Sequence, residues 1–300
     1  MALELYQAII LIGIGALVGI SISLAGQTGQ GVVLPIVLLF TGNVFLAISV
    51  NLLNDFITSL VASIKYVRNR EYRIRLDIFL IIFIAIIVTF FSVLILLSTA
   101  LNTIFGWFIP AFIICLGLFF IKQGFPTSES LKKLTERIKN KAGAKSQIEI
   151  PENKSKENFK SEIMPAEQRY SKIFILLALF FGAFIGINSG LFGAASGLIF
   201  VIALVIIYGY PLKKSVGTAL ILSMIICFST FILYLTLGLW IKKQIFFNLQ
   251  ISLFLAIGSI TTAIITSTYA QKISTKIMGK AIGFIIVILG ASALLIYFIS

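Results

Sequence analysis

The stretch that decides the fold is "LAGQTGQGVVLP", which runs from Leu24 to Pro35. It follows a nearly uninterrupted apolar run, residues 8–24, and brings three glycines, two glutamines and a threonine into apolar surroundings. Glycine weakens a helix, and irregular backbone is tolerated inside a membrane only where protein or a water-filled cavity encloses it. We therefore expect an enclosed break between two helices at this point.

The composition indicates a membrane protein. The chain is 59% hydrophobic, and its mean hydropathy of +1.08 excludes an ordinary soluble domain. The net charge of +13 does not indicate nucleic-acid binding, because the basic residues gather at segment ends and in one polar stretch. We predict an all-α polytopic protein in the lipid bilayer, with about ten hydrophobic segments, some of them re-entrant: 8–24, 31–41, 44–66, 76–98, 104–122, 171–190, 197–209, 214–240, 244–268 and 279–299.

Residues 124–170 form a polar stretch that divides the chain. They hold seven of the eleven acidic residues, so we expect a cytoplasmic linker between membrane halves 1–123 and 171–300. No Lys or Arg precedes Lys65, whereas the loop after the third segment is rich in them and should be cytoplasmic. Counting crossings then puts the N-terminus outside the cell membrane and the linker inside. Lys242 and Lys243 would lie outside, against the rule.

The two halves share a repeated pattern. "GALVGI" at residues 15–20 matches "GAFIGI" at residues 182–187, and each is followed by a glycine-containing break, with one extra residue in the first. Residues 47–52 match residues 215–220 after one more gap. Each half has an odd number of crossings, which predicts two inverted repeats of the kind common in transporters. The glycines spaced by four residues, at 15/19 and 182/186, suit close helix packing.

Asp55 is the one ionisable side chain that we expect deep in the membrane. An unpaired charge there costs on the order of 2.5–3.5 kcal/mol. Either Asp55 takes up and releases a proton, or helps to hold a cation, as the protein changes state, or it stays protonated and bonds a neighbouring helix. Asn51, Asn54 and Thr58 share its helical face, and we assign Asn54 with Asp55 to the coupling of protons to transport.

The breaks also suggest where an anion could bind. The first N–H groups of a helix are unpaired and its dipole is positive there, so a helix that begins in a cavity forms an anion site without Lys or Arg. The alternative is that the glycines serve only close packing. The predicted substrate-binding residues are Gln27, Thr28, Gly29, Gln30, Gly31, Asn51, Asn188, Ser189, Ser196, Gly197 and Thr218.

Other chemistry finds little support in the sequence. The chain has no histidine, and its two cysteines, Cys115 and Cys227, both lie in apolar segments, so neither a zinc site nor a disulfide framework is expected. No catalytic constellation of the usual kinds is present, and we predict neither an enzyme nor a cofactor. The sequence contains no nucleotide-binding motif, so nothing in it suggests transport driven by ATP.

The second half carries the clearest resemblance. "GLFGAASG" at residues 190–197 and "YPLKKSVGT" at residues 210–218 resemble the TauE/SafE family, whose usual motif is "GxxGGG" followed by "PxKAVGTS". The sequence departs from that pattern at residues 194–196, in "GQTGQG" and at Asp55. The resemblance implies a secondary transporter of small sulfur-containing anions such as sulfite or sulfonates, with a passive anion channel as the alternative. The matching residues are Gly193, Gly197, Pro211, Lys213, Val216, Gly217 and Thr218.

Overall fold

The computed structural model describes residues 5–26, 29–98, 172–194, 196–242 and 247–270, with Lys272 and Phe284. Within these ranges the chain is helical and contains no strand, as the sequence predicts. The first set of helices is α1 (Leu5–Ala25), α2 (Gln30–Thr41), α3 (Val44–Arg68) and α4 (Ile78–Ser98). The second set is α7 (Lys172–Phe192), α8 (Gly197–Tyr208), α9 (Leu212–Leu237), which continues into a π-helical turn (Gly238–Lys242), and α10 (Leu249–Ala270).

Six of these helices can cross a membrane by length and composition: α1, α3, α4, α7, α9 and α10. The other two, α2 and α8, have 12 residues each, about 18 Å, whereas the hydrocarbon core is about 30 Å thick. The predicted segments 31–41 and 197–209 are therefore helices too short to cross. The predicted segments 104–122 and, Phe284 apart, 279–299 lie outside the described residues, as does the linker 124–170.

The two sets repeat one sequence of helix lengths. The first three helices have 21, 12 and 25 residues in the first set and 21, 12 and 26 in the second. Four residues separate the long helix from the short one in both sets, 26–29 and 193–196. The prediction that the first break is one residue longer than the second is therefore wrong, because α2 begins at Gln30 and not at Gly31. Both short helices end at a glycine in the left-handed conformation, Gly42 and Gly209, where a side chain would be strained.

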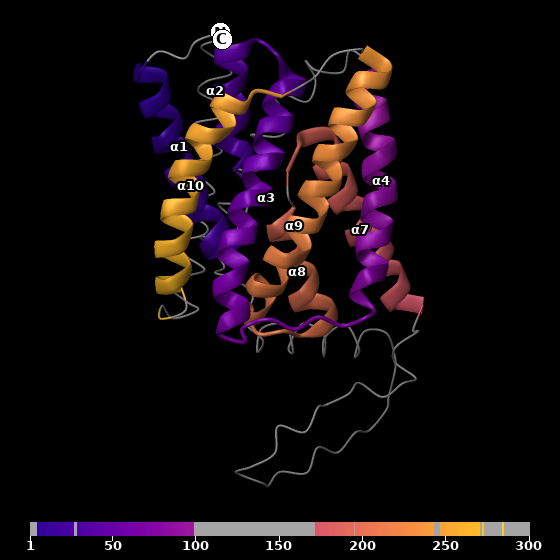
Figure 1. Ribbon diagram of the computed structural model, residues 1–300. Helices are drawn as coiled ribbons and strands as arrows, with labels where there is room; N and C mark the ends of the chain where they lie inside the picture. The colour runs from indigo at the N-terminus through magenta and orange to yellow at the C-terminus, as the bar shows by residue number, and fades with distance from the viewer. Residues whose placement is uncertain are drawn as a thin grey trace, which may run out of the picture.

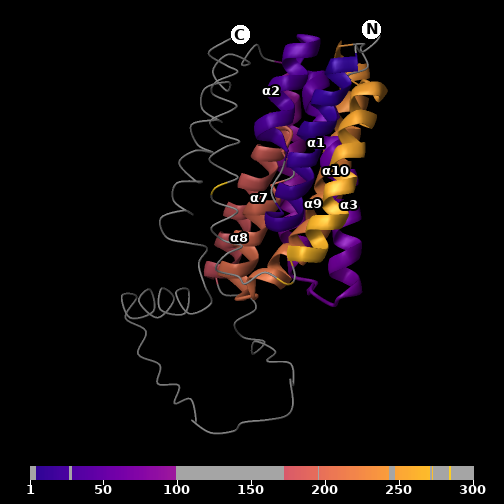
Figure 2. The same cartoon turned by 90° about the vertical axis from the view of Figure 1, so that its left-hand side faces the viewer.

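The helices of the two sets pack across one another. Figures 1 and 2 show α2 toward the end of the molecule where α1 begins, and α8 toward the opposite end. The long helices α3 and α9 pack together. Outside them, α1 packs along α10, and α7 packs along α4. The first helix of each set is thus paired with the fourth helix of the other set.

Glycines allow these two outer pairs of helices to approach closely. A Cβ atom added to any of four glycines would meet the partner helix, mostly at its backbone: Gly15 against Leu255, Gly19 against Ser259, Gly182 against Ile84 and Ile81, and Gly186 against Ala85. The packing role that the sequence predicts for these glycines is confirmed.

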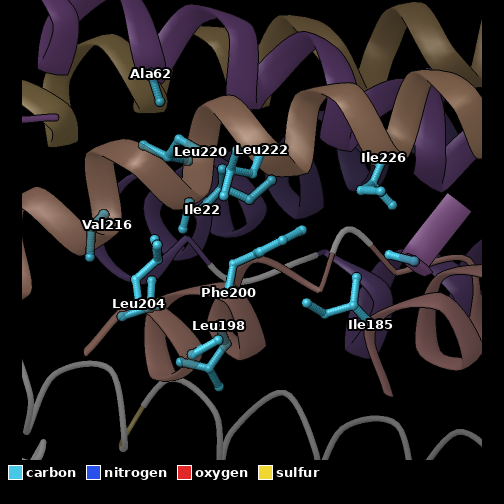
Figure 3. Close-up of a cluster of buried hydrophobic side chains, with 14 of the residues drawn as sticks. Ile22, Ala62, Ile185, Leu198, Phe200, Leu204, Val216, Leu220, Leu222 and Ile226 are labelled. Atoms are coloured by element: carbon cyan, nitrogen blue, oxygen red, sulfur yellow. The ribbon is translucent and has the colours of Figure 1, made fainter. Parts of the chain in front are cut away.

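An apolar core joins the two sets. Figure 3 shows part of it, with side chains from α1 (Ile22), α3 (Ala62), α7 (Ile185), α8 (Phe200) and α9 (Leu220). Large apolar side chains also cover the outside of the helices: Phe83 and Phe180, for example, are each 63% exposed. A buried apolar core with an apolar exterior suits a protein whose surroundings are lipid.

The loops that begin α4 and α9 lie together at one end of the molecule. The backbone N–H of Arg73 donates to the hydroxyl of Thr218 (2.9 Å), which in turn donates to the carbonyl of Lys214 (2.7 Å). The guanidinium of Arg73 lies 5.6 Å from the ring centre of Tyr210. Two loops that are distant in sequence and rich in Lys and Arg therefore share one end, as expected if both face the cytoplasm.

Candidate functional site

The two helix breaks touch one another in the interior. Gly26 follows α1 with φ of +64°, and Gly197 begins α8. A Cβ atom at Gly197 would collide with the carbonyl oxygen of Gly26, and a Cβ atom at Gly26 would lie 3.7 Å from the carbonyl carbon of Gly197. Because the two backbones are this close, only glycine fits at position 197. The two breaks therefore meet at this contact.

One face of α3 contacts both breaks. The backbone N–H of Gly29, which precedes α2, donates to Asp55 Oδ1 (3.1 Å). The amide of Asn51 donates to the carbonyl of Gly193 in the other break (2.7 Å), and at 3.4 Å to Asp55 Oδ2. Asp55 and Asn51 are completely buried. The polar face of α3 therefore points inward, and it links the two breaks.

The starts of α2 and α8 lie near the middle of the two central helices. Asp55, which bonds Gly29, is the twelfth residue of α3 counted from Val44. Ser223, which lies beside Gly197, is likewise the twelfth residue of α9 counted from Leu212. Its Oγ is 2.9 Å from the position that a Cβ atom would take on Gly197. Both helix starts therefore lie at mid-depth of the bundle, where water is scarcest.

The two helix starts differ in what the chain presents to them. The start of α2 faces the carboxylate of Asp55. At α8 the preceding residue, Ser196, has φ of +53° and its side chain does not cap the helix. Its hydroxyl instead accepts from the Asn188 amide (2.8 Å) and lies 3.2 Å from the carbonyl oxygen of Ile185, to which it can donate. The start of α2 thus faces the acidic side chain of Asp55 on α3, whereas the residue beside the start of α8 is Ser223 on α9.

Two of the buried polar atoms that lack a partner in the described part of the chain lie at these breaks. Within the described part of the chain, Ser223 Oγ and Asn51 Oδ1 have no hydrogen-bond partner. Ser223 adjoins Gly197, and Asn51 Oδ1 lies 3.2 Å from the position of a Cβ atom on Gly29. A buried polar group left unpaired costs about 1–3 kcal/mol. Such atoms beside two helix starts point to a ligand or water that completes their hydrogen bonds.

The other predicted site residues have varied surroundings. Gln27 and Thr28 lie outside the described residues, and Gln30 and Gly31 begin α2. The Ser189 hydroxyl shares a 2.8 Å hydrogen bond with Thr230 of α9. Asn54 Oδ1 accepts from Ser259 of α10 (2.9 Å), and its Nδ2 has no partner among the described residues.

Thr218 is the predicted binding residue that the structure places elsewhere. Its hydroxyl bonds the loop before α4. The loop partner Arg73 is 145 residues away in sequence, so sequence spacing gave no sign of this contact. Thr218 is explained by its role as an anchor for the loop and not by contact with the breaks.

Two buried tyrosines support the breaks and were missed in the sequence. Tyr66 of α3 donates to the carbonyl of Ser23 (3.0 Å), and Tyr234 of α9 donates to the carbonyl of Gly190. Each acceptor lies three residues before the left-handed glycine of its break, in the last turn of a helix, where carbonyls lack helical partners. The match of residues 47–52 with 215–220, if extended at the same spacing, pairs Tyr66 with Tyr234 and also Asp55 with Ser223. The signal was therefore present in the repeat.

The family described as "Sulfite exporter TauE/SafE" matches residues 11–293 of the chain. The chain belongs to the TauE/SafE family. Comparison with curated proteins and with solved structures gave no match. The match confirms the resemblance carried by residues 190–197 and 210–218. With six helices able to cross a bilayer, this TauE/SafE protein is a multi-pass membrane protein of a transporter family.

Proposed function

We propose that this TauE/SafE protein is a secondary transporter of small sulfur-containing anions, such as sulfite, a sulfonate or a related organosulfur anion. Membership of the family supports the class of cargo. The observation that carries the proposal for this chain is the contact between its two breaks at mid-depth of the bundle, where Gly26 at the end of α1 lies against Gly197 at the start of α8 and Gly29 before α2 bonds Asp55.

Helix starts suit an oxyanion in such a place. The first turn of a helix offers several N–H groups and a partial positive charge, so it holds an anion without a buried Lys or Arg. The unpartnered hydroxyl of Ser223 adds a donor beside α8. A sulfonate or sulfite presents three oxygens, which a helix turn and a hydroxyl together can bond. Because the site would be formed mainly by backbone groups, it recognises shape and charge more than a particular substituent.

The packing of the two sets supports alternating access. The hairpins α1–α2 and α7–α8 enter from opposite ends, and their long helices pack on the fourth helix of the other set. This arrangement fits two inverted repeats with the site between them. Movement of one repeat against the other would open the breaks first to one side and then to the other. The basic loops at one end, around Arg73 and Lys214, support a cytoplasmic position for that end.

Flux into proteoliposomes tests the proposal. We expect saturable uptake of sulfite and methanesulfonate that chloride does not match, measured with and without an inward proton gradient. Protein-free liposomes and the Gly13→Ala variant, whose added Cβ would meet nothing within 4 Å, serve as controls. Uptake of chloride as fast as sulfite would contradict the proposed cargo. Resolvable single-channel currents would support the passive anion channel in place of the transporter.

A further inference from the structure

We infer that Asp55 is an internal anion at the start of α2, and that it must take up one proton when a transported anion binds at the start of α8. The inference rests on the proposed function and deepens it. It defines the relation between one buried acid and the cargo: ionised Asp55 and the bound anion exclude each other. In this step the carboxylate of Asp55 binds one proton and becomes a carboxylic acid, while one anion binds at the start of α8.

The contacts of Asp55 are those of a ligand at a helix start. Oδ1 accepts the backbone N–H of Gly29, the residue that precedes α2, and Oδ2 lies 3.4 Å from the amide of Asn51. The side chain is completely buried at the middle of α3. Backbone N–H groups at the positive end of a helix are the groups that would bind a transported anion. Asp55 therefore occupies, from within the chain, the kind of position that the cargo needs.

Ser223 occupies on α9 the position that corresponds to Asp55 on α3, and its side chain carries no charge. It is the twelfth residue of α9, as Asp55 is of α3, and it lies beside Gly197 at the start of α8. Its side chain is 1% exposed, and its oxygen has no hydrogen-bond partner among the described residues. A buried hydroxyl that is left unpaired beside a helix start is an independent sign of a missing ligand. We therefore assign the anion site to the start of α8, whereas Asp55 lies at the start of α2.

The two positions are too closely connected for independent charges. Gly26 and Gly197 lie backbone to backbone, and Asn51, which contacts Asp55, also bonds Gly193 of the second break. Like charges that share a buried site do not both remain ionised, because little solvent screens them.

The backbone N–H of Gly29 and the amide of Asn51, which donate to Asp55, carry no charge. The thiol of Cys227 on α9 is a titratable group that interacts with Asp55 across the interface, and α10 presents the hydroxyl of Ser259 to the neighbouring Asn54. The connection before α2 presents a backbone N–H. A thiol becomes negative when it ionises, so it cannot neutralise Asp55 or the anion. Uptake of a proton by Asp55 is the step that removes the repulsion.

Calorimetric titration of the full-length protein in nanodiscs tests the inference. The probes are methanesulfonate and thiosulfate, which stay fully ionised near neutral pH and so contribute no proton of their own. Titrations in two buffers of different ionisation enthalpy give the protons bound per anion. We expect uptake approaching one proton, and a Kd that rises about tenfold per pH unit where Asp55 is ionised in the free protein. In Asp55→Asn we expect anion binding without proton uptake and with a Kd that pH does not change.

A second variant identifies the group that is protonated. Cys227→Ala removes the thiol that faces Asp55 and should leave proton uptake as in the wild type. Binding to the wild type without proton uptake, or proton uptake that persists in Asp55→Asn, would overturn the inference while leaving the proposed function in place. Loss of proton uptake in Cys227→Ala would overturn it as well. Absence of binding in the wild type and in Asp55→Asn would overturn the proposed function and this inference together.

Discussion

The two helix breaks of this protein have the same backbone arrangement, but the side chain beside the start of the short helix is acidic in one and uncharged in the other. Both connections have four residues, begin with a left-handed glycine and are supported by a buried tyrosine from the central helix of their own set. The side chain at the start of the short helix differs: Asp55 at α2 and Ser223 at α8. The glycine and the tyrosine that shape each break occur in both sets, whereas the acid that changes its electrostatics occurs in one. The shape of the break and its charge are therefore set by different residues.

The link between the breaks is also one-sided. Asn51 reaches from α3 to the carbonyl of Gly193, whereas the residue at the same position of α9 is Ala219, which has no polar side chain. The first set of helices thus supplies both the buried acid and the amide that contacts the second break. In the alternating-access cycle that we propose, the first set would therefore be the one that responds to protonation.

The largest effect should come from closing the contact between the breaks. In Gly197→Ala the new Cβ would collide with the carbonyl of Gly26, so the backbones must separate. We expect a loss of about 3 kcal/mol in stability, at the upper end for overpacking. Thermal unfolding in detergent measures it, with Gly13→Ala as the matched control, since nothing lies within 4 Å of that position. Equal unfolding temperatures for the two variants would show that the breaks are not in contact.

The next effect concerns the charge difference itself. Ser223→Asp gives α8 the acid that α2 already has, and the new carboxylate should occupy the anion site. We expect affinity for methanesulfonate at neutral pH to fall about thirtyfold, close to 2 kcal/mol. Lowering the pH protonates the new acid and should restore part of the affinity.

The control for this variant is Ser223→Asn, which matches aspartate in size but carries no charge. Its affinity should fall only a few-fold, through the change of shape beside Gly197. If Ser223→Asp and Ser223→Asn weaken binding equally at all pH values, charge at the start of α8 does not control the site. The open-site role of Ser223 would then be wrong.

The smallest effect tests what the two breaks have in common. Tyr66→Phe and Tyr234→Phe each remove a hydroxyl that bonds a buried carbonyl near the end of a long helix. We expect each to lower stability by about 1–2 kcal/mol, because the carbonyl loses its partner. Thermal unfolding of the two variants should show similar losses. A loss in one variant alone would show that the tyrosines are not equivalent, despite their matching positions.

Much of the site was predictable because it depends on local sequence. The breaks follow from glycines after long apolar runs, and the inward face of α3 follows from polar residues spaced by three and four. The pairing of Asp55 with Ser223 needed only an extension of the repeat. The position of Thr218 was not predictable, because a hydroxyl on a helix near other polar residues carries no sign of which distant loop it will bond. The predicted segment 31–41 begins one residue after the observed start of α2 at Gln30.

The sequence by itself determined that this is a helical membrane protein, with two glycine breaks and one acid in the middle of a crossing helix. These properties depend on hydropathy and on the backbone freedom of glycine, which act over short distances along the chain. Only the tertiary structure decided that Gly26 lies against Gly197, that Asp55 lies at the start of α2, and that Ser223 lies beside the start of α8. Those contacts join residues from 26 to 171 positions apart, and close packing between helices sets them.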